Sequence, residues 1–262
     1  MLYCQVLADS DRTAHITTYG TAMTTLALSL VENNAVRPFA FSVKRVINAG
    51  YTGRNTEAVK AHIAELAREG VAPPPMIPML YPLPANSISL DQRIEVVGSK
   101  TSGEVEFVLL VTQGEVYVGM GSDHTDRELE RVSVQASKQI CPNILAPVVW
   151  KLREIENHWD DLLLQSWVVL EDQQSAEEKI LYQQTRLATM LSPQQLLLKV
   201  SRAFGRQELD LQALDGLVLY SGTTPILTGE MLFGAQFFGE LYDPVDDRKI
   251  SCGYRIAVLP IF

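Results

Sequence analysis

The stretch EVEFVLLVTQGEVYVGMGSD, residues 104–123, contains two runs rich in β-branched and aromatic residues, joined by the short turn TQG. Two strand-forming runs around a glycine-containing turn predict an antiparallel β-hairpin. Because strand side chains alternate between two faces, Glu104 and Glu106 are expected to project from the same face of the first strand. Asp123 ends the second strand, so we expect it to lie across the hairpin from these two glutamates.

These three carboxylates have two interpretations. A strand that alternates polar and apolar residues is the ordinary signature of a solvent-facing edge, in which the glutamates are simply hydrated. Alternatively, Glu104, Glu106 and Asp123 converge, and converging carboxylates repel one another unless a cation lies between them. Ligation by oxygen atoms alone selects a hard ion such as Mg²⁺, Mn²⁺ or Ca²⁺. The pattern therefore predicts a divalent-metal site, with the hydrated edge strand as the alternative.

Outside the hairpin, strands outnumber helices and do not alternate regularly with them. We expect strands over residues 2–8, 24–32, 43–49, 93–98, 162–171, 177–184, 216–222, 235–244 and 251–260. Helices are expected over residues 56–69, 126–139 and 193–204, and the proline-rich residues 72–84 are expected to run extended. This order of elements favours a mixed, β-rich α+β fold.

Composition limits the classes of partner. The chain has 262 residues, of which 47% are hydrophobic, enough to bury a sizeable core. Its 22 Lys and Arg against 31 Asp and Glu give a net charge of −9, which argues against binding to nucleic acid or to an anionic membrane. The apolar runs are too short to cross a bilayer, and the N-terminus lacks the pattern of a signal peptide. With three cysteines and no CxxC motif, these features predict a cytoplasmic protein.

Several segments resemble, in order along the chain, the motifs of the fumarylacetoacetate hydrolase superfamily. Those motifs are E-x-E, N-D-V-S-A-R-D, K-G-F-D followed by G-P, and T-G-T-P. The segments are GYTGRN (50–55), EVEFVLLV (104–111), YVGMGSDHTDRE (117–128), SKQICPNILAP (137–147) and LVLYSGTTP (217–225). The resemblance covers about residues 45–260 and is closer still to a bacterial branch of unknown function. It implies a rolled or barrel-like sheet with peripheral helices over residues 46–262, after a small N-terminal β region at residues 1–45, and a homodimer.

The resemblance also implies a set of site residues. Glu104, Glu106 and Asp123 match the metal ligands, and Lys138 falls where the superfamily has its catalytic lysine. The expected substrate-binding residues are Tyr51, Arg54, Gly222 and Thr223.

The chain departs from the superfamily where a histidine is expected, because Thr56 occupies that position. His62 and Glu65 follow on the same predicted helix and face the same side, so they are the expected catalytic dyad, with a surface polar pair as the alternative. His124, next to Asp123, is the second candidate for the base. Arg54 is expected to clamp a substrate carboxylate or to cap the neighbouring helix.

Together these residues predict a divalent-metal-dependent hydrolase or lyase acting on a small keto acid or 1,3-dicarbonyl through a metal-bound enolate. A decarboxylase, hydratase or tautomerase would use the same residues. We expect a small anionic substrate. The alternative is a non-catalytic metal-binding or assembly protein on the same fold.

Overall fold

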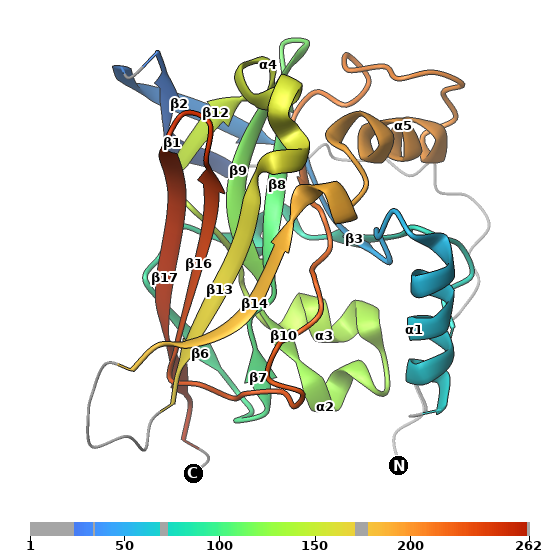
Figure 1. Ribbon diagram of the computed structural model, residues 1–262, viewed down its shortest axis with the longest axis vertical. Coiled ribbons are helices and arrows are strands. Elements are labelled where there is room, and N and C mark those ends of the chain that lie inside the picture. The colour runs from blue at the N-terminus through green and yellow to red at the C-terminus, as the bar shows by residue number, and fades with distance from the viewer. Residues whose placement is uncertain (1–23, 34, 69–72, 171–177, 261–262) are drawn as a thin grey trace, which may run out of the picture.

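Two β-sheets packed on each other make up most of the molecule. The computed structural model describes residues 24–33, 35–68, 73–170 and 178–260, without the side chains of His62 and Leu66. The larger sheet has ten strands and curls into a half-barrel, the smaller has five, and short helices lie at the periphery (Figure 1). This architecture confirms the expected β-rich fold with a rolled sheet.

The larger sheet is assembled from segments distant in the sequence. Its strand order is β2-β1-β12-β9-β8-β15-β3-β4, with β11 and β5 attached at β9. The β8–β9 pair is the predicted hairpin, whereas β1 with β12 and β3 with β15 are parallel pairs. Its strands are β1 (Thr24–Glu32), β2 (Ala35–Val43), β3 (Arg45–Gly50), β4 (Met79–Leu83), β5 (Ile88–Ser89), β8 (Val105–Thr112), β9 (Glu115–Asp123), β11 (Asn143–Leu145), β12 (Val148–Lys151) and β15 (Leu217–Tyr220).

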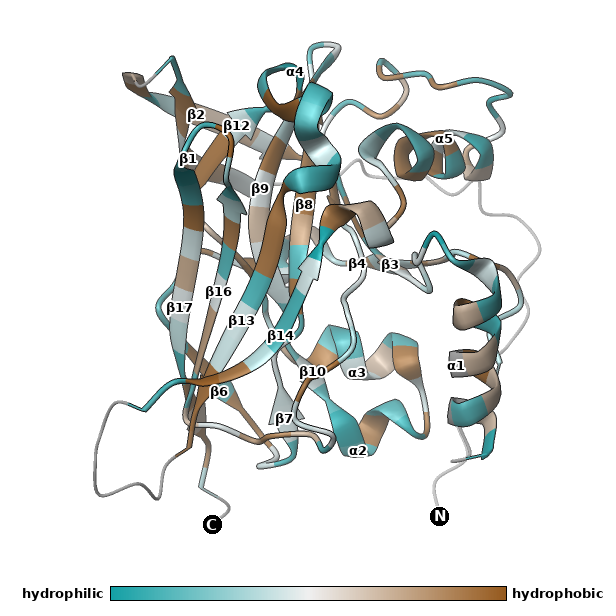
Figure 2. Cartoon of the chain, in the orientation of Figure 1, coloured by the Kyte–Doolittle hydropathy of each residue, from teal (hydrophilic) through white to brown (hydrophobic). Residues whose placement is uncertain are grey.

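The smaller sheet has the order β14-β13-β16-β17-β6 and covers one face of the β8–β9 hairpin. Its strands are β6 (Arg93–Val96), β13 (Leu163–Val169), β14 (Ile180–Arg186), β16 (Gln236–Asp243) and β17 (Arg248–Val258). A separate pair joins β7 (Thr101–Ser102) to β10 (Thr125–Asp126). Hydrophobic residues concentrate in strands such as β8 and β13 (Figure 2).

The helices are short, and one expected helix is divided. These are α1 (Thr56–Arg68), α2 (Arg127–Glu130), α3 (Val134–Ile140), α4 (Leu152–Ile155), α5 (Pro193–Ala203) and the 3₁₀ turns η1 (Ala85–Ser87), η2 (Glu156–Asp161) and η3 (Leu187–Thr189). The continuous helix expected over residues 126–139 is wrong, because the Asp126 side chain caps α2 and the Ser133 side chain caps a second helix, α3.

Strand β8 lies in the interior of the larger sheet and is buried on both faces. Val105 and Phe107 pack toward the smaller sheet, whereas Val108 belongs to a second core on the other face. Glu106 shares the face of Val108 and is only 1% exposed. The interpretation of this segment as a hydrated edge strand is therefore wrong. The buried carboxylate of Glu106 needs compensating charge or hydrogen bonds.

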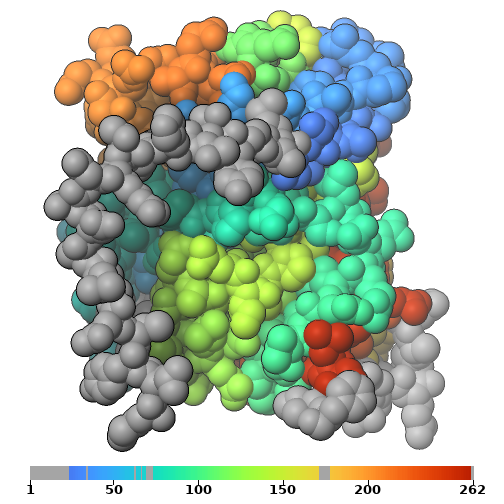
Figure 3. Space-filling model, turned by 180° about the vertical axis from the view of Figure 1, so that it is seen from behind, coloured from blue at the N-terminus to red at the C-terminus, as the bar shows by residue number. Residues whose placement is uncertain are grey.

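The N-terminal strands belong to the larger sheet. Strand β1 pairs with β12, and β2 forms its edge. Residues 2–8, an expected strand, lie outside the described part of the chain, and the division of the chain at residue 45 remains a prediction. The proline-rich segment supplies β4, an edge strand, where Pro82 is tolerated. Seen from behind, residues 73–100 cross the molecule between the β1–β2 hairpin and helices α2 and α3 (Figure 3). None of the helices within the described ranges is long and apolar enough to span a membrane.

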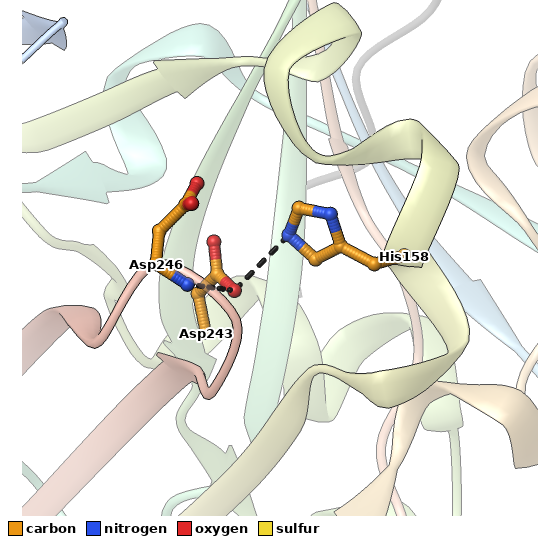
Figure 4. Close-up of side chains that lie close together, drawn as sticks. All are labelled: His158, Asp243 and Asp246. Atoms are coloured by element: carbon orange, nitrogen blue, oxygen red, sulfur yellow. Dashed lines mark hydrogen bonds and ion pairs between the residues drawn. The ribbon is translucent and has the colours of Figure 1, made fainter.

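A group of polar and acidic side chains links the β16–β17 turn to η2. His158, Asp243 and Asp246 lie within 4.8 Å of one another (Figure 4). His158 Nε2 lies 3.0 Å from Asp243, and Arg248 pairs with Asp243, Asp246 and Glu154 at 3.0–3.3 Å. Since the guanidinium already supplies positive charge to both aspartates, we interpret this group as a structural ion-pair network.

Replacing Asp243 by asparagine should destabilise the protein by about 2 kcal/mol near pH 7, since a buried, charge-assisted network loses its acceptor. Burial alone would raise the pKa of Asp243, but His158 and Arg248 hold it below its ordinary value. A lowered pKa contributes stability above the pKa of the unfolded chain, and that contribution is lost as the pH falls through the folded-state value. Urea denaturation at pH 7 and pH 3 should show the difference shrinking in acid. An unchanged difference would contradict this assignment.

Candidate metal and substrate site

A pocket of about 220 Å³ opens beside the ends of β8 and β3, against helices α2 and α3. Its walls combine acidic, basic, phenolic and apolar side chains. The lining residues are Ala49, Gly50, Tyr51, Tyr81, Glu104, Glu106, Arg127, Glu130, Val134, Lys138, Gly222, Thr223 and Met231. Six of these are residues that the sequence predicts for the site.

The hairpin register brings the three expected metal ligands together. Glu104 and Asp123 are directly opposed, since each donates its backbone N–H to the other's carbonyl oxygen at 3.1 Å. Glu106 follows on β8, so its side chain lies on the same face as that of Glu104. One carboxylate oxygen from each of the three residues lies within 4.8 Å of the others. Asp123 is fully buried, whereas Glu104 and Glu106 line the pocket.

Lys138 lies among these carboxylates. The Nζ atom of Lys138 donates to Asp123 and lies 3.5 Å from Oε2 of Glu104. Burial alone would lower the pKa of Lys138, but the surrounding carboxylates, Asp123 first, raise it well above its ordinary value. The lysine therefore stays charged at the pocket wall. Its position follows from α3, which begins at the Ser133 cap and buries the side chain of Lys138.

Arg127 is a site residue for which the sequence analysis assigns no role. Its Nη1 atom lies 3.0 Å from both Oε1 of Glu104 and Oε2 of Glu130, and its Nε donates to Ser102 Oγ at 2.8 Å. Burial would raise the pKa of Glu104, but Arg127 and Lys138 hold it below its usual value. Glu130 is a second pocket residue to which the sequence assigns no role. The signal was present, because Arg127 and Glu130 are three residues apart on one helix face.

Glu106 has less compensation than Glu104. The backbone N–H of Gly222 donates to its Oε2 at 2.8 Å. Burial, and then the negative charge of Asp123, raise the pKa of Glu106 well above its ordinary value. Counting Glu130, four carboxylates and two cations of the described residues leave the site with a formal charge of −2. The donor set therefore fits one divalent cation, which would relieve the repulsion between Glu106 and Asp123.

The expected substrate-binding residues Tyr51, Gly222 and Thr223 line the pocket. Gly222 has φ +82°, and a Cβ atom there would lie 2.7 Å from Thr52 Oγ1, so only glycine fits. The hydroxyl of Thr223 donates to the carbonyl oxygen of Val105 at 2.9 Å. Tyr51 has φ +61°, a conformation that is uncommon for a side-chain-bearing residue and is often found at functional sites.

Arg54 lies elsewhere. Its guanidinium binds Asp160 at 2.8 and 2.5 Å, and its Nε donates to the carbonyl oxygen of Met190. The side chain of Asn55, and not Arg54, caps α1 by accepting from two backbone N–H groups. Arg54 is thus not among the described residues that line the pocket, and it fastens the loop before α1 to η2. The clamp on a substrate carboxylate that is expected of Arg54 stays a prediction.

The described residues do not test the expected dyad of His62 and Glu65. Glu65 is exposed on α1 and does not line the pocket, and the side chain of His62 lies outside the described part of the structure. The dyad stays a prediction. His124 is buried, with Nδ1 3.0 Å from the Tyr254 hydroxyl and Nε2 2.9 Å from Thr101 Oγ1. Burial lowers its pKa to about 3, so we interpret His124 as a neutral bridge between strands.

Comparison with known sequences gives one family. The model of a family described as "Protein of unknown function (DUF2848)" matches residues 49–254. Among curated proteins, none matches the sequence.

Solved structures resemble the chain over most of its length. The structure titled "2-keto-3-deoxy-D-arabinonate dehydratase apo form" has a TM-score of 0.55 at 15% identity, covering 88% of this chain and 79% of that one. A putative uncharacterized protein from Mycobacterium abscessus has a TM-score of 0.54 at 16% identity, with coverage of 86% and 82%. "Crystal structures of Cg1458" gives 0.54 at 14% identity, with 86% and 80%. The chain thus has the fold of the fumarylacetoacetate hydrolase superfamily, which confirms the resemblance at the level of fold.

Titration of Mg²⁺ or Mn²⁺ into chelator-treated protein should give saturable binding by calorimetry. Glu106→Gln and Asp123→Asn should each weaken this binding by on the order of 100-fold or more, since losing a ligand costs at least as much as losing its supporting partners. Glu115→Gln, an exposed carboxylate on β9 paired with Arg153, is the control and should bind as wild type. Equal affinities for all four proteins would rule out the three-carboxylate site.

Proposed function

The chain belongs to the DUF2848 family of proteins of unknown function, and we propose that it is a divalent-metal-dependent hydrolase or lyase acting on a small keto acid. Glu104, Glu106 and Asp123 would hold the ion, with Mg²⁺ the first choice and Mn²⁺ or Ca²⁺ the alternatives. The homodimer that the superfamily resemblance implies is part of the same proposal.

One observation carries this proposal: Glu104, Glu106 and the buried ammonium group of Lys138 line one open pocket, and the carboxylate of Asp123 converges on the two glutamates from behind its wall. A purely structural ion needs ligands on all sides and no access for another molecule. Here Glu104 and Glu106 line a cavity of about 220 Å³, large enough for a small organic molecule. This favours a catalytic site over the non-catalytic alternative.

A divalent ion bound there would act as a Lewis acid on the oxygens of a keto acid. The chain's own residues would position the substrate and stabilise its charge. Lys138 stays protonated and lies where negative charge develops on a substrate oxygen. The phenols of Tyr51 and Tyr81 remain protonated at neutral pH, because burial raises both pKa values, that of Tyr81 to about 12. They can therefore donate hydrogen bonds to a bound anion.

The name of one structural neighbour supports the choice of substrate class. A 2-keto-3-deoxy-D-arabinonate dehydratase acts, by its name, on a keto acid, and its structure resembles this chain at 15% identity. Hydrolysis, dehydration, decarboxylation and tautomerisation of a keto acid can all pass through an enolate, so the proposal covers this group of reactions.

Purified protein should turn over at least one member of a panel of acylpyruvates, oxaloacetate, 2-keto-3-deoxy sugar acids and 2-hydroxydienoates, and a chelator should abolish the activity. Lys138→Met should lower kcat by on the order of 100-fold or more while Mg²⁺ still binds, because it removes a preorganised positive charge. Lys44→Met, a lysine paired with Asp215, is the control. Turnover that survives both the chelator and Lys138→Met would overturn the proposed site.

We also propose His62 as the group that moves a proton, with Glu65 orienting it. His62→Ala should lower kcat by on the order of 10² to 10⁴, with Mg²⁺ affinity unchanged. Lys60→Ala on the same helix, where Lys60 pairs with Glu57, is the matched control. If the two variants have similar, near-normal rates, His62 is not the base.

A further inference from the structure

Glu130 is the outermost carboxylate of the pocket. Side-chain exposure rises from 0% at Asp123 and 18% at Glu104 to 25% at Glu130. Tyr51 and Tyr81 line the same pocket as Glu130, and the negative charge of Glu130 contributes to the raised pKa values of both phenols. Glu130 therefore lies toward the open end, where the part of a substrate remote from the metal ligands would be.

Glu130 and Glu104 share one arginine. Each places a carboxylate oxygen 3.0 Å from Nη1 of Arg127, so these two oxygens are no more than 6.0 Å apart. The guanidinium is already bound by two carboxylates and by Ser102, which leaves little of its charge for a ligand. An anionic group of a ligand near this wall would therefore approach the partly exposed carboxylate of Glu130, and not an unpaired cation.

We propose that Glu130 determines specificity: the substrate is a keto acid with a single carboxylate, and its far end is uncharged and bears hydroxyl groups. This inference rests on the proposed function, which places the keto acid group at Glu104, Glu106 and Asp123. A second carboxylate at the far end would face Glu130 and be repelled, whereas a hydroxyl can donate a hydrogen bond to it. The phenols of Tyr51 and Tyr81 offer further partners for hydroxyl groups.

Three probes of equal chain length test this proposal: 2-oxopentanoate, 2-oxoglutarate and a 2-keto-3-deoxypentonate. Calorimetry with the full chain at saturating Mg²⁺ gives the affinities, and KM replaces Kd for any probe that is turned over. Wild type should bind 2-oxopentanoate at least tenfold more tightly than 2-oxoglutarate, and the hydroxylated probe at least as tightly as 2-oxopentanoate.

Glu130→Gln should improve the binding of 2-oxoglutarate at least tenfold, because it removes the repelling charge and frees Arg127. Binding of 2-oxopentanoate should stay within about twofold. Glu128→Gln makes the same change on the exposed side of the same helix, so it should keep the wild-type ratio of affinities. Glu130→Asp, which keeps the charge, should also keep the discrimination.

Equal wild-type affinities for 2-oxoglutarate and 2-oxopentanoate would overturn the proposal without any variant. The proposal can therefore be tested even if Glu130→Gln folds poorly. The same ratio in Glu130→Gln and Glu128→Gln would also overturn it. Either result leaves the proposed keto acid function standing. If no probe binds Mg²⁺-loaded wild type, the function itself fails, and this inference with it.

Discussion

The fold depends on cations and hydrogen bonds that compensate the negative charge buried inside a β-sheet. Glu106 and Asp123 are almost completely excluded from solvent, and such carboxylates are costly to bury unless cations and hydrogen bonds surround them. Lys138 and Arg127 supply the cations, and the backbone N–H of Gly222 supplies a hydrogen bond. When Glu104 and Glu130 are counted as well, the four carboxylates exceed the two cations by two charges, which is why the site suits a divalent ion.

This requirement explains several local features around the pocket. The chain breaks one helix into α2 and α3, and the break lets Arg127 and Lys138 approach the carboxylates from two directions. Gly222 adopts a left-handed conformation against Thr52, and in this conformation the backbone N–H of Gly222 points at Glu106. Each feature would be unfavourable or unnecessary in a surface hairpin.

The β8–β9 hairpin and the convergence of its three carboxylates could be predicted because they depend on local sequence: alternation, a short turn and register. The division of the helix over residues 126–139 was missed because Ser133 competes with the continuing helix for the backbone N–H of Ala136. The role of Arg54 could not be predicted, since its partner, Asp160, is 106 residues away. The pairing of Glu130 with Arg127 could be predicted from their spacing, but the position of Glu130 in the pocket depends on how α2 packs, which only the folded chain reveals.

The parallel pairings of the larger sheet impose an order on folding during synthesis. Strand β1 has its parallel partner at residues 148–149, and β3 has its parallel partner at residues 217–220, so neither is paired on both sides until most of the chain has left the ribosome. Contacts between distant segments form slowly, because a long loop must close first. Gly222 belongs to the last third of the chain and donates to Glu106, so a nascent or truncated chain carries the acidic hairpin without its full support. The proposed metal site thus gains the hydrogen bond from Gly222 only when the polypeptide is nearly complete.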